Sequence, residues 1–198
     1  MKRIGLFGGT FDPVHLGHTE LAKKVLSQFG LDKIIFIPAG APPHKLLKKR
    51  ADKIHRFNMV KLATEDFPFF EVSDFEVFSE KPSYSYITIT HFKEKFPEDE
   101  IFFIVGADSF RDFPEWKNYE TLISLCEFIV VSRPQIPKES YYEKYKNIEN
   151  LPKAEFIEDA YFDFSSTEIR KRMEENRSIK GLVPDKVENY IKTNKLYI

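Results

Sequence analysis

Residues 5–18 read Gly-Leu-Phe-Gly-Gly-Thr-Phe-Asp-Pro-Val-His-Leu-Gly-His, and this stretch decides the fold. It follows residues 2–7, which have the apolar character of a buried strand, and it leads into residues 19–29, where apolar residues recur with helical spacing. A strand, a glycine turn and a helix can bind phosphate, because the helix N-terminus offers free N–H groups and a partial positive charge. The pattern therefore predicts an anion-binding turn.

Side chains within the stretch make this prediction more specific. Gly8 and Gly9 are expected to adopt positive φ and to let the backbone approach a ligand closely. His15 and His18 are three residues apart in the first turn of a helix, so both face the same side and can lean toward a phosphate. Histidines at a helix start are more often caps or surface features, so the pair alone decides nothing. Neither G-x-G-x-x-G nor G-x-x-x-x-G-K-[ST] fits the chain.

Composition limits the class of protein. A chain of 198 residues with 42% hydrophobic residues suits a single α/β domain spanning residues 1–198. Lys and Arg number 30 against 31 Asp and Glu, so the net charge of −1 provides no general field for nucleic acid or membrane, and we expect neither as a partner.

Cysteine content and the N-terminus bear on location. The single cysteine, Cys126, excludes an internal disulfide framework, cannot build a zinc site alone, and is expected to pack in the core. Met1 leads directly into a strand without a signal peptide, and the longest apolar runs are too short to span a bilayer. We therefore expect a cytoplasmic protein. Whether it forms a homo-oligomer is left open.

Strands and helices alternate along the rest of the chain. Short apolar runs predict strands at residues 33–38, 69–72, 101–105, 127–132 and 154–157, and helical spacing or capping signals predict helices at residues 53–66, 83–96, 116–126, 165–176 and 184–194. Residues 83–96 also have strand composition, but a parallel sheet needs a crossover there, which favours a helix. The alternation predicts an α/β fold: a Rossmann-like, doubly wound parallel sheet with helices on both faces.

Three loops follow strands that end on the same edge of this sheet, at residues 8–18, 39–45 and 106–109. Ligands of doubly wound sheets bind at the carboxyl ends of the strands, near the reversal in strand order. A second motif, Phe-Ser-Ser-Thr-Glu-Ile-Arg at residues 164–170, begins a helix with a capping box, and by itself it needs no ligand. Its hydroxyls, N–H groups and Arg170 could also hold the outer phosphates of a nucleotide.

Both motifs resemble those of the nucleotidyltransferase superfamily. The signature G-x-F-x-P-x-H-x-G-H is complete, and I-S-S-T-x-I-R is matched at residues 164–170 with Phe164 in place of Ile. Further stretches resemble the bacterial nicotinate mononucleotide adenylyltransferase family: Pro42-Pro43-His44-Lys45, Arg56-x-x-Met59, Pro82-Ser83-Tyr84-Ser85, Gly106-Ala107-Asp108-Ser109, Trp116-Lys117, and Ser178-Ile179-Lys180 before Leu182-Val183-Pro184. Ile87 stands where this family usually has Asp, and Gly181 where an aromatic residue is common.

The resemblance implies attack by a mononucleotide phosphate on the α-phosphorus of ATP, with release of pyrophosphate. It implies catalytic roles for His15, His18, Lys45 and Arg170. The ATP site that it implies comprises Gly8, Gly9, Thr10, Phe11, His15, Gly17, His18, Gly106, Asp108, Ser165, Ser166, Thr167 and Arg170. Magnesium would enter with ATP, bridging phosphate oxygens largely through water, because the sequence has no carboxylate cluster that would form a dedicated cage.

The resemblance also implies a site for nicotinate mononucleotide. Lys45 would bind its phosphate, Trp116 would stack on the pyridine ring, and Ser85 with the backbone at Lys117 would donate to the carboxylate. Two alternatives stay open: a sister nucleotidyltransferase with another phosphorylated acceptor, such as phosphopantetheine, and a nucleotide sensor that kept the fold without the chemistry.

Overall fold

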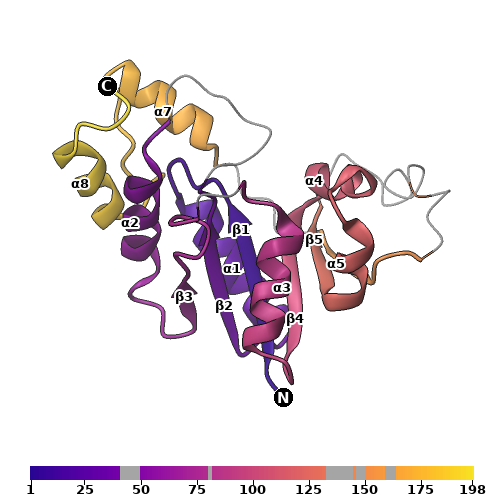
Figure 1. The fold of residues 1–198 in the computed structure, drawn as a ribbon. Coiled ribbons are helices and arrows are strands. Elements are labelled where there is room, and N and C mark those ends of the chain that lie inside the picture. Colours follow the sequence, from indigo (N-terminus) through magenta and orange to yellow (C-terminus); the bar gives the residue numbers. More distant parts are fainter. Residues whose placement is uncertain (41–49, 80–81, 133–144, 146–149, 159–163) are drawn as a thin grey trace.

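Six parallel strands form one sheet at the centre of the protein (Figure 1). The computed structural model describes residues 1–40, 50–79, 82–132, 145, 150–158 and 164–198. The strand order is β3-β2-β1-β4-β5-β6. The bounds are β1 Arg3–Gly9, β2 Lys33–Pro38, β3 Phe70–Val72, β4 Glu100–Gly106, β5 Glu127–Val131 and β6 Ala154–Ile157. The N-terminal strand therefore lies in the middle of the sheet, as its apolar sequence predicts.

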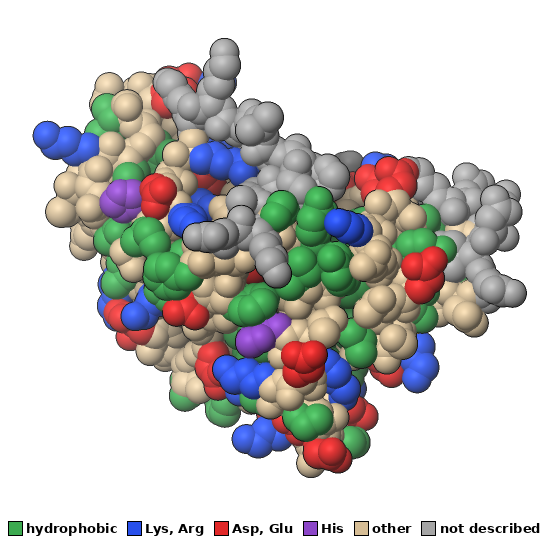
Figure 2. All heavy atoms as spheres, viewed as in Figure 1, with side chains coloured by type: hydrophobic (Ala, Val, Ile, Leu, Met, Phe, Trp, Pro, Cys, Tyr) green, Lys and Arg blue, Asp and Glu red, His purple; other side chains and the backbone are tan. Residues whose placement is uncertain are grey.

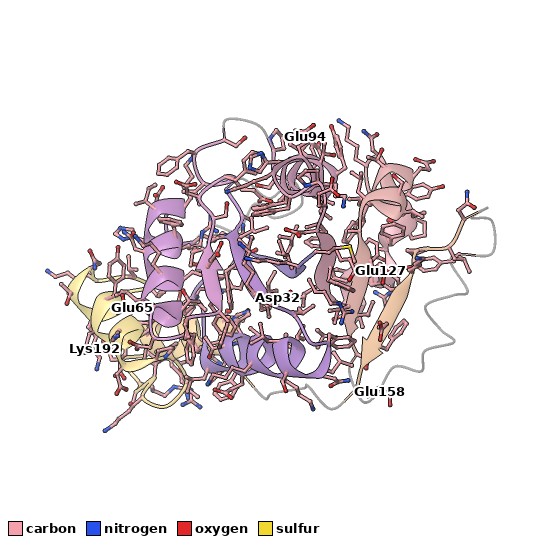
Figure 3. The ribbon with its side chains drawn as sticks, turned by 90° about the horizontal axis from the view of Figure 1, so that it is seen from below. Asp32, Glu65, Glu94, Glu127, Glu158 and Lys192 are labelled. Carbon is pink, nitrogen blue, oxygen red and sulfur yellow. The ribbon has the colours of Figure 1, made fainter. Side chains whose placement is uncertain are left out.

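Helices cover both faces of this sheet, as the view from below shows (Figure 3). Their bounds are α1 Leu16–Gln28, α2 Lys53–Thr64, α3 Ser85–Lys95, α4 Ala107–Arg111, α5 Tyr119–Leu125, α7 Ser166–Glu174 and α8 Asp185–Thr193, with a 3-10 turn η1 at Phe113–Glu115. Strand side chains alternate between two hydrophobic cores: in β4, Phe102 and Ile104 face the core of α1, α2, α7 and α8, whereas Ile101 and Phe103 face that of α3 and α5. The predicted doubly wound fold is confirmed.

The strand order reverses between β1 and β4, which pair in parallel with Phe7 beside Ile104. The chain leaves β1 toward β2 on one side, and β4 continues toward β5 on the other. The carboxyl ends of these two central strands, at Gly9 and Gly106, therefore lie side by side at one edge of the sheet. Doubly wound proteins bind their ligands at this point.

One predicted helix was wrong at its start. Residues 116–126 were expected to be helical throughout, but α5 begins only at Tyr119. Asn118 adopts a left-handed conformation with φ 54°, and η1 precedes Trp116. The short helix α4 directly after β4 was also missed, because five residues are too few to show helical periodicity. The ambiguous segment at residues 83–96 does form a helix, α3.

Within the residues that the structure describes, no helix is long and apolar enough to cross a membrane. Cys126 is 7% exposed and packs in the core, as expected.

Candidate active site

The two glycines that precede the loop of residues 10–15 do not have the expected conformation. Gly8 and Gly9 are the last residues of the strand, paired with Ile37 and Pro38, and neither has positive φ. Gly9 is small for another reason: a Cβ there would lie 2.8 Å from the ring of Phe11. Phe11 itself makes the turn, with φ 49°. The expectation of positive φ at the two glycines was wrong, because sheet pairing keeps them extended.

His15 and His18 occupy the start of α1, as predicted, and their rings stack with centroids 3.7 Å apart. The backbone N–H of His15 donates to Nδ1 of His18 at 3.2 Å. An Nδ1 that accepts a hydrogen bond leaves Nε2 as the protonated nitrogen of a neutral imidazole. The fold therefore sets the tautomer in which His18 can donate through Nε2.

Both imidazoles are neutral near pH 7. Burial lowers the pKa of His15 to about 4. Burial, together with the neighbouring His15, lowers the pKa of His18 well below its usual value. His15 is 8% exposed, and His18 lies edge-on to Phe11 at 5.0 Å between ring centroids. Neutral rings avoid the repulsion of two stacked cations, and each still offers an N–H to an anion.

The two sequence motifs meet in space, although about 150 residues separate them. The ring of Phe164 stacks on His15 at 6.0 Å. Gly17 permits this contact, since a Cβ there would lie 3.1 Å from Phe164 and from Nδ1 of His15. The folded chain thus places the second motif directly against the first.

Helix α7 is hydrogen-bonded directly to the β1–α1 loop. The hydroxyl of Ser166 donates to the carbonyl oxygen of Pro13 at 2.9 Å, and Nη1 of Arg170 donates to that of Asp12 at 2.6 Å. Arg170 Nη2 also donates to Oγ1 of Thr167 at 3.2 Å. Ser165 caps the helix by accepting from the N–H of Glu168, as the capping box predicts. The helix N-terminus thus stands beside the histidines.

Arg56 and Asp12 fix the β1–α1 loop against the segment that precedes α2. The residue types alone predicted no role for either of them. Arg56, 3% exposed, donates to the carbonyl oxygens of Thr10 at 2.8 Å, Gly40 at 3.2 Å and Ala51 at 3.2 Å. Asp12, also 3% exposed, accepts from the N–H of Ala51 at 3.1 Å. For Arg56, the sequence offered one signal of a buried role: a charged residue among the apolar positions of the predicted helix.

The residues expected to bind the mononucleotide fall into two groups. Lys45 lies outside the described residues, so its role stays a prediction. Ser85 begins α3, and Trp116 and Lys117 follow η1. The Nζ of Lys117 lies 4.6 Å from the ring centroid of Tyr84, next to Ser85, so these two segments lie together.

Trp116 occupies a rim position. One side of its ring packs on Phe103 and Phe113, with centroids 6.2 Å and 5.5 Å away, and the residue stays partly exposed. An aromatic ring held on one side and open to solvent is suited to stacking on a flat ligand.

Gly106 and Asp108 lie where β4 passes into α4. Gly106 is exposed, and a Cβ at this position would meet no atom within 4 Å. Its φ of −72° is open to any residue, so the free protein does not require glycine here. Asp108 is half-buried in the first turn of α4.

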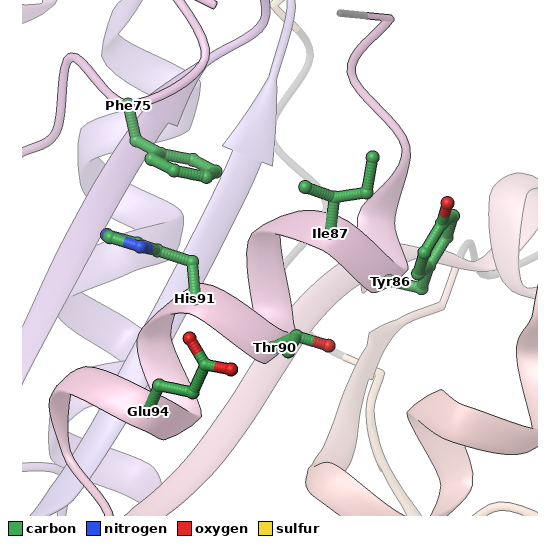
Figure 4. A pocket seen from close by; sticks show the side chains of 6 residues that line it. All are labelled: Phe75, Tyr86, Ile87, Thr90, His91 and Glu94. Atoms are coloured by element: carbon green, nitrogen blue, oxygen red, sulfur yellow. The ribbon is translucent and has the colours of Figure 1, made fainter.

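The structure describes both positions at which the sequence departs from the family pattern, and it explains Gly181. Ile87 lines a shallow groove of about 340 Å³ on the outer side of α3, with Phe75, Tyr86, Thr90, His91 and Glu94 (Figure 4). Hydrophobic side chains gather near the middle of the face seen in Figure 2. Gly181 has φ 76° in the turn before α8, a conformation that favours glycine over an aromatic residue.

The described residues of the site include few carboxylates. Among the described residues, no group of three or more His, Cys, Asp or Glu side chains could hold a metal ion. Asp12 is the carboxylate of the β1–α1 loop, and one of its oxygens is already used by Ala51.

The fold and this site define a nucleotidyltransferase. The chain matches the model of the cytidylyltransferase-like family over residues 6–172. It is 43% identical to the probable nicotinate-nucleotide adenylyltransferase of Clostridium tetani over the whole of both chains. It is 41% identical to the nicotinate-nucleotide adenylyltransferase of Bacillus subtilis, covering 100% of this chain and 99% of that protein. The chain belongs to the nicotinate-nucleotide adenylyltransferase family.

A solved structure supports the fold independently. The nicotinic acid mononucleotide adenylyltransferase of Plasmodium falciparum, complexed with NaAD, superposes with a TM-score of 0.81. The alignment covers 100% of this chain and 98% of that chain at 24% sequence identity. At this identity the likeness concerns the fold alone.

Proposed function

We propose that this protein transfers the adenylyl group of ATP to nicotinate mononucleotide, giving nicotinate adenine dinucleotide and pyrophosphate in NAD biosynthesis. The observation that carries the proposal is the contact between the two motifs: α7 is hydrogen-bonded through Ser166 and Arg170 to the loop that presents the histidines. Full-length relatives named for this activity support it.

In the reaction, a phosphate oxygen of the mononucleotide forms a bond to the α-phosphorus of ATP. The bond from that phosphorus to the oxygen that bridges to the β-phosphate breaks, and pyrophosphate leaves. No covalent enzyme intermediate is needed, so most of the rate comes from aligning two anions and stabilising the charge that develops.

Each side chain then has a stated task. His18, whose Nδ1 is occupied by the His15 N–H, donates from Nε2 to the α-phosphate in the transition state. His15 donates to the neighbouring phosphates. Ser166, Thr167 and Arg170 at the start of α7 hold the pyrophosphate end, together with the N–H groups of that helix. Gly106 and Asp108 lie against the adenosine.

Magnesium enters with ATP as part of the substrate complex. When bound, the ion neutralises phosphate charge. His15 and His18, as neutral imidazoles, would donate N–H groups to the phosphates and add no charge of their own.

The acceptor, nicotinate mononucleotide, binds near the start of α3 and the segment that follows η1. Trp116 stacks on its pyridine ring, while Ser85 and the backbone at Lys117 donate to its carboxylate, with Lys117 held beside Tyr84. Lys45 binds its phosphate. Competition between nicotinate mononucleotide and the corresponding amide measures how far these donors select the acid, and a preference for the amide would contradict their assignment.

The decisive experiment measures pyrophosphate release from ATP and nicotinate mononucleotide. His18→Ala should lower kcat on the order of a hundredfold, because one donor to the transition state is lost, with substrate affinity largely intact. His91→Ala, on the outer side of α3, is the matched control and should retain activity. Unchanged turnover in His18→Ala would sink the assigned role, and release with phosphopantetheine instead would identify another acceptor.

The remaining attributes are proposals of the same kind. We propose a cytoplasmic enzyme with small nucleotides as its partners, acting without nucleic acid or membrane, in keeping with its net charge of −1. We further propose that residues 1–198 act as one domain, whose C-terminal helices complete the ATP site. Light scattering would determine whether it forms a homo-oligomer.

A further inference from the structure

The C-terminal tail, residues 194–198, follows a fixed path back toward the active site. Lys195 and Tyr197 have φ values of 50° and 65°, which residues other than glycine adopt only where surrounding contacts hold them. Between them, Leu196 is 9% exposed within the hydrophobic core, and its N–H donates to the carbonyl oxygen of Ile191 at 3.0 Å. The tail is therefore anchored and does not end as a frayed segment.

Tyr197 ends this path at the β1–α1 loop. Its hydroxyl donates to Oδ1 of Asp12 at 2.7 Å, across 185 residues of sequence. The same oxygen accepts from the N–H of Ala51 at 3.1 Å. A carboxylate that is 3% exposed must have its charge met by donors. Asp12 thus depends on two segments that are distant in the chain.

The second oxygen of this carboxylate lies near one guanidinium, and the charge of the carboxylate also acts on a second one. Oδ2 makes no hydrogen bond to the described part of the chain, but Nη1 of Arg170 lies 3.9 Å away. Burial lowers the pKa of Arg56, and the charge of Asp12 acts in the opposite direction. Burial and the charge of Asp12 raise the pKa of Tyr197, so its hydroxyl keeps the proton that it donates.

Asp12 is also the point where both halves of the site meet. Its backbone oxygen accepts from Arg170 of α7, and His15 follows three residues later in the same loop. A displacement of Asp12 would therefore move the histidines relative to the N-terminus of α7. Geometric errors of this kind reduce rates strongly, even when they arise away from the reacting atoms.

We propose that Tyr197 is a positioning residue for adenylyl transfer, whose hydroxyl holds the Asp12 carboxylate and with it the loop that presents His15 and His18. The inference rests on the proposed function. It differs from a purely structural role for the tail, because it ties one hydroxyl oxygen to the rate of the chemical step.

The test compares two tyrosine hydroxyls. Tyr197→Phe removes the contact to Asp12. Tyr190→Phe removes another hydrogen-bonded hydroxyl, which contacts Nδ1 of His55 and Nδ2 of Asn58, both at 3.0 Å, between α8 and α2. We expect kcat to fall about tenfold or more in Tyr197→Phe and to stay within about twofold of the unaltered protein in Tyr190→Phe. The KM for nicotinate mononucleotide should change little in either.

A double-mutant cycle with Asp12→Ala, which removes the acceptor oxygen that an asparagine would keep, separates positioning from general destabilisation. If both residues act through one hydrogen bond, the double variant should lose no more kcat than the more impaired single variant. The inference is overturned if Tyr197→Phe keeps full kcat, if Tyr190→Phe loses as much, if the two losses in the cycle simply add, or if Tyr197→Phe is inactive because it fails to fold.

The unaltered chain is assayed first. If it releases no pyrophosphate with nicotinate mononucleotide, the proposed function fails, and calorimetric titration with ATP then decides the inference. In that case Tyr197→Phe should bind ATP about tenfold more weakly, whereas Tyr190→Phe should bind it as the unaltered chain does. Equal affinities in all three proteins would refute the positioning role.

Discussion

Arg56→Met tests whether the buried guanidinium holds the active-site loops in place. Methionine keeps the length and apolar stem of the side chain but removes the hydrogen bonds to the carbonyl oxygens of Thr10, Gly40 and Ala51, at 2.8, 3.2 and 3.2 Å. Removing one member of a buried charged network typically costs about 3–5 kcal/mol, because the remaining polar groups stay buried. Asp12 would also lose a compensating positive charge.

Urea denaturation, followed by Trp116 fluorescence and by far-UV circular dichroism, measures this cost. We expect the free energy of unfolding to fall by about 3–5 kcal/mol, and the melting temperature of a chain of this size to fall by roughly 10 °C. Arg172→Met is the matched control: Arg172 is half-buried on the surface of α7 and forms an i,i+4 ion pair with Glu168, so its loss should cost less than about 1 kcal/mol.

The reasoning is refuted if Arg56→Met costs no more than Arg172→Met. A second consequence concerns catalysis, since Arg56 fixes the carbonyl of Thr10 at the beginning of the loop that carries the histidines. At a temperature where the variant is still folded, its KM for ATP should rise while that of Arg172→Met does not.

Three further predictions concern the nucleotide sites and pH. Gly106→Ala should leave stability within about 0.5 kcal/mol, because its Cβ meets no atom within 4 Å, yet raise the KM for ATP about tenfold if adenosine lies against it; an unchanged KM contradicts that placement. Nicotinate mononucleotide should quench the fluorescence of Trp116, and Trp116→Leu should raise the KM for this substrate about tenfold without affecting that for ATP; undiminished emission at saturation argues against stacking. The pKa of His15 is about 4 in the folded protein, below its ordinary value of 6.5. Between these two pH values the unfolded chain binds a proton at His15 that the folded chain does not. The free energy of unfolding should therefore fall by about 3 kcal/mol from this group as the pH drops from 6.5 to 4. Urea midpoints across this range should depend less on pH in His15→Gln, and an identical dependence would show that His15 is not buried in its neutral form.

Local patterns in the sequence were enough to predict the architecture. Short apolar runs alternating with helical segments predicted the doubly wound sheet, because burial on both faces leaves a continuous apolar run in each strand. The same holds for the start of α1 at His15 and for the cap at Ser165, since caps act within one helical turn. Trp116 shows the limit of such patterns. It was predicted to lie in a helix, but the left-handed conformation of Asn118 makes the helix begin only at Tyr119, after Trp116.

Only the tertiary structure decided how the site is held together. Gly8 and Gly9 are extended because they pair with β2, and Phe11 is the residue that adopts positive φ in the turn. From the sequence, glycine is the residue for which positive φ would be predicted. The hydrogen bonds from Arg56 to Thr10 and from Tyr197 to Asp12 join residues 46 and 185 positions apart. Contacts over such distances have no period in the sequence, so they arise only when the folded sheet brings the segments together. The sequence by itself thus determined the fold class and the two motifs, and the folded chain decided what fixes them against each other.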